Sequence, residues 1–174
     1  MINFDYTGVF VKFLKSVRCL FEVRTLFNRG IMNDPDPKNS ITDERKQRAV
    51  AGLQSLPFAR LMGMRLVDIR PNEAVIEIEM RDNLRQPSGV LHGGVTATII
   101  DTAMAFAVRT HLADTEFSAT IDLTVHYLRP HTSGTFTCTA KVVRAGKRIF
   151  TVSADVENED GKLIATGLST YTRL

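Results

Sequence analysis

The sequence predicts an α+β domain in which a curved antiparallel sheet wraps around one long central helix. Three observations predict it: a strand-like run that alternates in hydrophobicity near residue 75, an apolar helical run over residues 93–112, and four more strand-like runs after it. The length of 174 residues suits one domain of this kind and leaves little room for a second.

A short helix is expected first, over Asp43–Leu56. Thr42 or Ser40 offers a side-chain oxygen to cap its first N–H groups, and Pro57 should end it. This helix would precede the first strands.

Two paired strands should follow this helix. Residues 73–80 read EAVIEIEM, where apolar side chains recur at every second position, as in a half-buried strand. Residues 64–69 are the expected partner strand, with Pro71-Asn72 as the turn between them. The two strands would form the first hairpin of the sheet.

The run GGVTATIIDTAMAFAVRTHL at 93–112 predicts a helix of about 20 residues, or roughly 30 Å. It is apolar on most faces, which favours burial, and Arg109 and His111 near its end suit the helix dipole. Asp101 in its middle is the anomaly, because a buried and unpaired carboxylate costs several kcal/mol. The Asp101 carboxylate must therefore be paired with another group, be solvated in a cleft, or take part in the chemistry.

The C-terminal part predicts four strands joined mainly by short turns with glycine, which indicates an antiparallel sheet. In the first of them, Ile121, Leu123 and Val125 are expected on one face, with Thr120 and Asp122 together on the other. Asp122 is interpreted as structural. The expected strands are 118–128, 135–144, 148–157 and 162–172.

Residues 1–40 are predicted to be an N-terminal extension and linker, and residues 41–174 the folded domain. The stretch 9–27 is amphipathic, and five charges within it argue against a membrane span. It is a packing helix, a helix for a membrane surface or for targeting, or an artefact of start-site choice with Met32 as the natural start. Prolines at 35 and 37 indicate the linker.

Composition narrows the class of function. The net charge of +3 is spread along the chain, which does not resemble the basic stripe of a nucleic-acid binder and suits a small anionic ligand equally well. The four histidines and two cysteines show no zinc-site spacing, so no metal is expected. Two isolated cysteines suit a reducing, cytoplasmic location.

The chemistry is expected around RQPSGVLHGG at 85–94 and Asp101. Gly93 and Gly94 stand where a loop meets a helix N-terminus, where free N–H groups and the positive end of the dipole favour an oxygen gaining negative charge. A carboxylate nearby can attack an acyl carbon or take a proton from water.

From about residue 53 to its end, the chain resembles the hot-dog thioesterases of the PaaI type. The resemblance rests on LHGG at 91–94 with an acid at 101, SATIDLTVHYLRP at 118–130, VVRAGKRI at 142–149 and the ending EDGKLIATGLSTYT. It implies a hot-dog fold and hydrolysis of an acyl-CoA thioester, with a medium-chain or aryl acyl group.

The resemblance also implies roles for single residues. The Gly93 N–H would polarise the thioester carbonyl, and Asp101 would be the nucleophile or the general base. Gln86 would hold the attacking water or the thioester, His92 would orient the loop near the sulfur, and Thr120 would position water. In relatives such a site lies between two subunits, so a dimer or tetramer is expected.

Further contacts to CoA are expected from Gly94, Arg129, Arg144, Lys147 and Arg148. CoA is here part of the substrate, and no cofactor is expected. Simpler alternatives stay open: Asp101 is a structural acid paired with Arg109, and the basic turn is solvated without contacting CoA. At the level of function, the alternatives are a non-catalytic acyl-CoA-binding module and a hydroxyacyl-thioester dehydratase.

Overall fold

The computed structural model describes residues 41–174. The amphipathic stretch at 9–27 and the linker at 34–37 lie outside these residues, and the division of the chain at residue 40 stays a prediction. Within residues 41–174, no helix is both long enough and apolar enough to cross a membrane.

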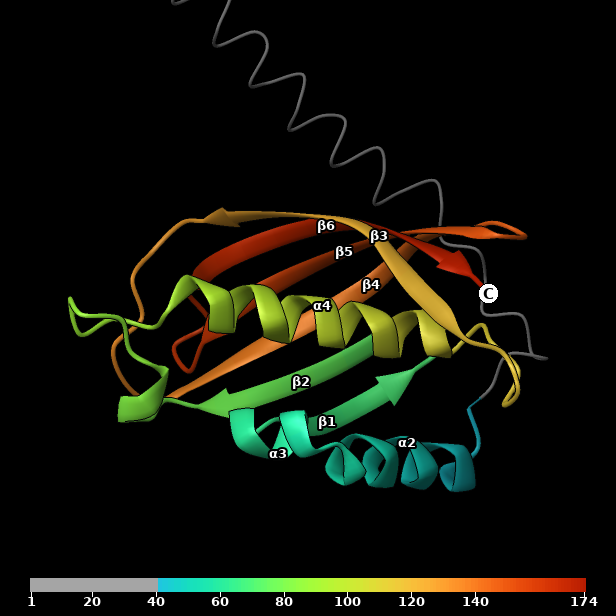
Figure 1. Ribbon diagram of the computed structural model, residues 1–174, viewed down its shortest axis with the longest axis horizontal. Coiled ribbons are helices and arrows are strands. Elements are labelled where there is room, and N and C mark those ends of the chain that lie inside the picture. The colour runs from blue at the N-terminus through green and yellow to red at the C-terminus, as the bar shows by residue number, and fades with distance from the viewer. Residues whose placement is uncertain (1–40) are drawn as a thin grey trace, which may run out of the picture. The chain divides into compact units, whose positions relative to one another are not determined.

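Six strands form one antiparallel sheet in the order β1-β2-β4-β5-β6-β3, and a long helix, α4, lies against one face of it (Figure 1). This confirms the predicted α+β class and its central helix. The strands are β1 (Arg65–Arg70), β2 (Glu73–Glu79), β3 (Ser118–Tyr127), β4 (Thr135–Ala145), β5 (Ile149–Asn158) and β6 (Leu163–Arg173).

The alternation read in the sequence explains the core on the sheet side. Ala74, Ile76 and Ile78 of β2 are fully buried, as the period of two predicted. The turn before them places Asn72 at a φ of 67°, a left-handed conformation that asparagine tolerates better than most residues. A short 3-10 turn, η2 (Asp82–Leu84), then leads toward α4.

The helix α4 runs from Gly93 to Arg109 and has 17 residues, so the expected length of about 20 was too long. It ends early because the chain turns at Thr110, whose hydroxyl donates to the carbonyl of Ala107 at 2.7 Å. The Arg45 guanidinium, which comes from an earlier helix, donates hydrogen bonds to the backbone carbonyls of Arg109 and Leu112.

Burial along α4 is one-sided. Its sheet-facing stripe is buried, but Thr98, Asp101, Thr102, Ala105 and Arg109 form a partly exposed stripe at helical spacing. The expectation that the helix is buried on most faces therefore holds for the sheet side only. Asp101 lies on the stripe that the sheet does not cover.

Two helices precede the sheet, α2 (Asp43–Ser55) and α3 (Pro57–Met62). Thr42 is the residue that caps α2, where its hydroxyl accepts the N–H of Arg45 at 3.3 Å. Pro57 does stop α2, but it also begins α3, because proline is tolerated in the first turn of a helix. In Figure 1, α2 runs antiparallel to α4.

A β-bulge interrupts β3. Thr120 pairs with Tyr171 and Asp122 with Thr170, so Ile121 is an extra residue without a partner. Thr120 therefore faces α4 together with Leu123, while Ile121 is 56% exposed. The predicted face, with Ile121 beside Leu123 and Thr120 beside Asp122, is wrong for this reason.

Candidate active site

The Asp101 carboxylate is held by two hydroxyl groups from the sheet. Its Oδ1 accepts a hydrogen bond from Tyr171 at 2.7 Å and one from Thr120 at 2.9 Å. The Tyr171 hydroxyl also lies 2.8 Å from the backbone carbonyl oxygen of Asp101. The predicted neighbourhood of Thr120 and Asp101 is present in one chain.

A close approach of β6 to α4 makes this contact. A Cβ added at Gly167 would lie 2.9 Å from Ile100 Cγ2, so only glycine lets the strand pass so near the helix. Tyr171 follows four residues later on the same face of β6, and its ring is buried. Burial raises the pKa of the Tyr171 phenol, and the neighbouring Asp101 raises it further, so the hydroxyl stays a neutral donor.

The other carboxylate oxygen, Oδ2, accepts no hydrogen bond from residues 41–174, and Asp101 is partly exposed. Arg109, considered as a structural partner, bonds instead to the carbonyls of Ala113 and Glu116 and lies near Asp114. The carboxylate is thus fixed at one oxygen and available at the other.

At the start of α4, His92 is the N-cap residue. Its Nδ1 accepts the N–H of Gly94 at 2.9 Å, which in a neutral ring places the proton on the outward Nε2. Among the described residues, the N–H of Gly93 has no hydrogen-bond acceptor. Of the two glycines, Gly93 is the one with a free donor.

Side-chain rings lie close against both glycines, so a larger residue at either position would have to displace a ring slightly. A Cβ at Gly94 would lie 3.0 Å from the His92 ring, and one at Gly93 would lie 3.3 Å from the ring of Tyr127. The Tyr127 hydroxyl also donates to the Gly93 carbonyl at 3.0 Å. The predicted contact of Gly94 with substrate stays a prediction, since its N–H already has a partner.

A cavity of about 430 Å³ opens beside Gly93. Gln86 and Arg129 both line it, with Tyr127 between the helix and the strand end. The Gln86 amide nitrogen donates to Ser88 at 3.0 Å, and the Arg129 guanidinium donates to the Leu163 carbonyl at 2.6 Å. The structure therefore brings Gln86 and Arg129 to the cavity beside Gly93, and their contacts with substrate stay predictions.

Gly93 and Asp101, however, stand well apart. Eight residues separate them on one helix, which corresponds to about 12 Å along its axis. A single carbonyl cannot contact the N–H of one and lie beside the carboxylate of the other. Within one chain the two groups therefore belong to different places.

The predicted CoA-binding basic residues are also divided. Arg129 follows β3 at the Gly93 end, whereas Arg144, Lys147 and Arg148 belong to the β4–β5 hairpin. The carbonyl of Arg148 accepts the N–H of Arg173, which pairs with the opposite end of β3, about 30 Å from Tyr127. The structure does not gather these four residues in one chain.

Two tyrosines at these places were not found from the sequence. Tyr171 and Tyr127 alternate within apolar strands and so look like ordinary packing residues. The only signal was a hydroxyl on a ring expected to be buried, which needs a hydrogen-bond partner.

Across residues 41–174, no three His, Cys, Asp or Glu side chains lie close enough together to bind a metal ion.

Comparison with known proteins gives this arrangement its context. The family model "Thioesterase superfamily" matches residues 88–165, which include all of α4 with Asp101 and the strands β3, β4 and β5. Human acyl-coenzyme A thioesterase 13 is 31% identical over 137 residues, which cover 75% of this chain and 95% of the relative. The medium/long-chain acyl-CoA thioesterase YigI of Salmonella typhimurium is 30% identical over 136 residues, or 67% of this chain and 84% of the relative.

Solved structures agree with the fold. A mutant of the phenylacetic acid degradation protein PaaI from Thermus thermophilus superposes with a TM-score of 0.63 at 29% identity. That match covers 68% of this chain and all of the other. With its six-stranded sheet around α4, the chain belongs to the thioesterase superfamily, has the PaaI-type hot-dog fold, and is a thioester hydrolase.

Proposed function

We propose that the protein hydrolyses acyl-CoA thioesters with a medium-chain or aryl acyl group, and that Asp101 promotes the attack. The observation that carries this proposal is the Asp101 carboxylate, which two hydroxyls hold at Oδ1 while Oδ2 accepts no bond within residues 41–174. The relatives named for acyl-CoA thioesters support the substrate class.

In the reaction, the free oxygen of Asp101 takes a proton from a water that attacks the acyl carbon, or it attacks the acyl carbon itself to form an anhydride that water then hydrolyses. Both routes need the same fixed carboxylate. Tyr171 and Thr120 hold it in one orientation, so it loses no rotational freedom when the substrate arrives. The chemistry uses side chains and backbone alone, without a cofactor.

The Gly93 N–H supplies the second requirement, a donor for the carbonyl oxygen as negative charge develops on it. It is the first N–H of α4 and carries the positive end of the helix dipole. Gln86, on the wall of the same cavity, would contact the thioester or water, and His92 presents its Nε2 near the leaving sulfur. CoA then leaves as a thiolate.

The 12 Å between Gly93 and Asp101 supports a site shared by two copies of the chain. β3 is an edge strand of the sheet, and unpaired edges favour strand pairing with another chain. Four large hydrophobic side chains are exposed on or beside it: Phe117, Ile121, Tyr127 and Leu128. Antiparallel pairing of two β3 strands would bring the Asp101 end of one chain toward the Gly93 end of its partner.

This pairing also unites the divided basic residues. The hairpin with Arg144, Lys147 and Arg148 lies at the end of β3 that would meet the Arg129 end of the partner. Such a cluster suits the phosphates of CoA. We therefore propose a homo-oligomer, a dimer or a dimer of dimers, as the active species.

The test is Asp101→Asn, which keeps the size of the side chain and removes its charge. We expect kcat for acyl-CoA hydrolysis to fall by about 100-fold or more, because general-base or nucleophilic catalysis contributes at least that much. Asp122→Asn is the matched control, since Asp122 lies beyond the bulge and its Oδ1 accepts the Thr170 N–H. Rates come from thiol release with a panel of acyl-CoA substrates.

The outcome also separates the alternatives. Near wild-type turnover in Asp101→Asn would contradict the role of Asp101. Tight binding of acyl-CoA by the wild-type chain without any turnover would instead indicate a binding module. A hydroxyacyl substrate that loses water and keeps its thioester would indicate a dehydratase.

A further inference from the structure

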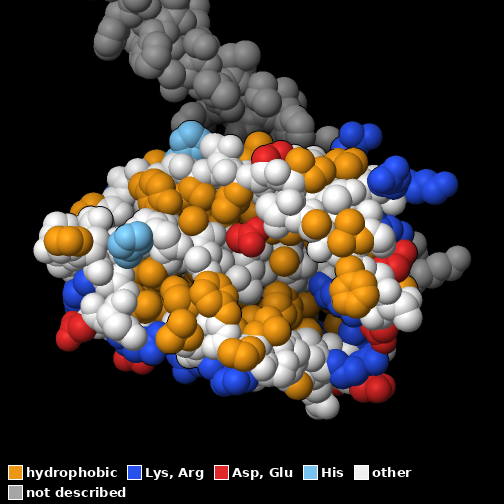
Figure 2. Space-filling model, in the orientation of Figure 1, with side chains coloured by type: hydrophobic (Ala, Val, Ile, Leu, Met, Phe, Trp, Pro, Cys, Tyr) orange, Lys and Arg blue, Asp and Glu red, His pale blue; other side chains and the backbone are white. Residues whose placement is uncertain are grey.

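A second and larger cavity lies between α2 and α4, with a volume of about 690 Å³. This volume lies within the range of small-molecule sites. Figure 2 shows this face of the molecule, where hydrophobic side chains gather over the region between the two helices. The cavity is separate from the one beside Gly93, with which it shares no lining residue.

The cavity walls are mostly apolar along their length. Leu56 and Phe117 are 48% and 68% exposed, so they border the cavity without filling it. Burying such apolar surface under an apolar guest is favourable. The apolar lining residues that matter here are Ala49, Leu56, Ile69, Ala105, Phe106 and Phe117.

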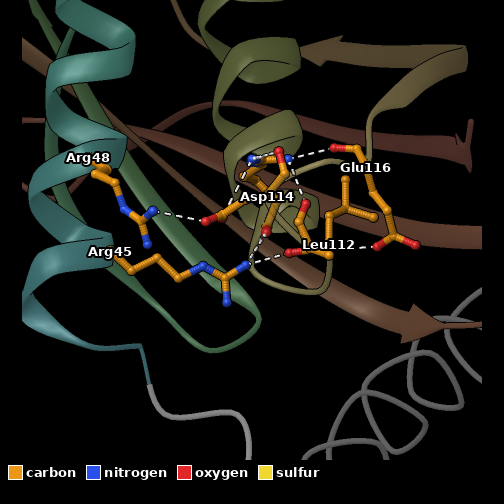
Figure 3. Close-up of polar contacts among 7 residues, drawn as sticks. Arg45, Arg48, Leu112, Asp114 and Glu116 are labelled. Carbon is orange, nitrogen blue, oxygen red and sulfur yellow. Dashed lines mark hydrogen bonds and ion pairs between the residues drawn. The ribbon is translucent and has the colours of Figure 1, made fainter.

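One end of the cavity is polar, and its charges already have partners. Arg45 donates to the carbonyls of Arg109 and Leu112 at 3.2 and 2.5 Å, and Arg48 bonds to Asp114 at 2.9 Å (Figure 3). Because these guanidiniums are occupied by carbonyls and a carboxylate, this end closes the cavity and does not attract a free anion. An apolar guest suits it better than a charged one.

Along α4, the lining of the cavity begins one helical turn beyond Asp101. Ala105, one helical turn after Asp101, lines the cavity, and so does Ser118, two residues before Thr120 on β3. The helix α4, which carries Asp101, and the strand β3, which carries Thr120, therefore both contribute residues to the cavity walls. A chain attached to a carbonyl at Asp101 can enter here.

The distance limits the length of that chain. From Asp101 to Arg109, α4 rises about 12 Å. An extended alkyl chain advances about 1.25 Å per carbon, from a 1.52 Å bond and an angle near 111°. About ten carbons fit between the carboxylate and the arginines.

Gly52 lines the cavity on its α2 side, at an exposed position. It is seven residues after Arg45, or about 10 Å along α2. Because α2 runs antiparallel to α4 (Figure 1), this displacement leads back from the arginine end toward Asp101. A Cβ added at Gly52 would have no atom within 4 Å, so the missing side chain leaves open space.

Glycine is also a poor helix former, and α2 gains nothing from it locally. We propose that the cavity between α2 and α4 receives the acyl chain, and that Gly52 determines specificity by leaving it open to chains of about ten carbons. This inference rests on the proposed acyl-CoA hydrolysis. It assigns the chain-length preference to one position on a helix that carries none of the proposed catalytic groups.

The experiment compares kcat/KM of the full chain for acetyl-, hexanoyl-, decanoyl- and hexadecanoyl-CoA. For the wild type, we expect kcat/KM to rise from acetyl to decanoyl and to rise no further with hexadecanoyl. In Gly52→Phe, the ring occupies the path, so the ratio of decanoyl to acetyl kcat/KM should fall at least tenfold. Gly52→Leu is the second variant and should lower the same ratio.

Ala51→Phe is the matched control, because Ala51 is exposed, neighbours Gly52 on α2 and lies outside the cavity lining. Its ratio should equal that of the wild type, and thermal unfolding verifies that all three variants fold. Wild-type ratios in both folded Gly52 variants would overturn the inference while leaving the proposed hydrolysis intact. A wild-type chain that hydrolyses no acyl-CoA would count against the proposed function itself.

Discussion

At the scale of single residues, Tyr171 most directly determines the geometry of the candidate site. Its hydroxyl contacts both the carboxylate and the carbonyl oxygen of Asp101, at 2.7 and 2.8 Å. A tyrosine whose pKa is raised by burial gives up no proton to the carboxylate and takes none from water. It is therefore a positioning residue, and Asp101 performs the chemistry.

This position predicts a specific kinetic effect for Tyr171→Phe. The variant removes the hydroxyl and keeps the buried ring, so we expect kcat to fall about tenfold or more through loss of orientation, with little change in KM. The free energy of unfolding should fall by about 1 kcal/mol for the lost hydrogen bond. Steady-state kinetics and urea unfolding measure the two effects.

Thr170→Val is the control for this prediction, since Thr170 neighbours Tyr171 on β6 and points to the other face of the strand. It should leave kcat unchanged. A Tyr171→Phe variant with wild-type kcat and reduced stability would restrict Tyr171 to a structural role.

At the scale of secondary-structure elements, the bulge in β3 decides which side chains face the helix. With Ile121 left unpaired, Thr120 and Leu123 both point toward α4, although they are three residues apart. In a regular strand they would face opposite sides. The one extra residue thus places Thr120 on the α4 side of the strand, where its hydroxyl donates to Asp101.

Moving the hydroxyl by one position tests this element. In the double variant Thr120→Ile/Ile121→Thr the hydroxyl stands at the bulged position, which is exposed, so it should no longer reach Asp101. We expect kcat to fall as far as in Thr120→Val, while far-UV circular dichroism still reports the sheet. Ile121→Val keeps both the bulge and Thr120 and serves as the control. Wild-type kcat in the exchanged variant would contradict the role of the bulge in orienting Thr120.

The elements were largely predictable from the sequence, because hydrophobic periodicity identifies strands and the helix. The bulge was not, since Ile121 is apolar and continues the alternation by type. The neighbourhood of Asp101 and Thr120 followed from the family resemblance, whereas Tyr171 looked like one more buried ring. The cavity at Gly52 exists because glycine has no side chain there and because α2 and α4 lie apart. A sequence pattern predicts neither the open space nor the spacing of the two helices.

At the scale of the whole molecule, α4 carries both proposed catalytic groups at a separation that prevents them from acting together in one chain. Gly93 begins the helix and Asp101 lies about 12 Å along it. The exposed edge of β3 offers the surface on which two chains would meet. Each proposed site then takes Gly93 from one chain and Asp101 from the other.

Complementation tests this division. Asp101→Asn removes one half of each site. Gly93→Pro removes the other, because proline lacks the N–H yet fits the first turn of a helix, and His92 before it is already extended, with φ −67° and ψ 132°. Each variant alone should be nearly inactive.

When the two variants are unfolded together and refolded, random pairing should restore about a quarter of wild-type activity, since half of the dimers are mixed and each mixed dimer has one intact site. A mixture no more active than its components would place Gly93 and Asp101 in the same chain's site. Refolded Asp101→Asn mixed with itself is the control.

The antiparallel pairing of β3 with the β3 of a second chain would also set the distance between Gly93 of one copy and Asp101 of the other. Sliding one chain along the other by a single pairing step of two residues would move Gly93 of one copy by about 7 Å relative to Asp101 of its partner, with no change inside either chain. Every contact described within residues 41–174 would survive such a slip, and both sites would be lost together. In the assembly that we propose, turnover therefore depends on the register between the β3 strands of the two chains. A correctly folded protein that is paired one step out of register would be inactive.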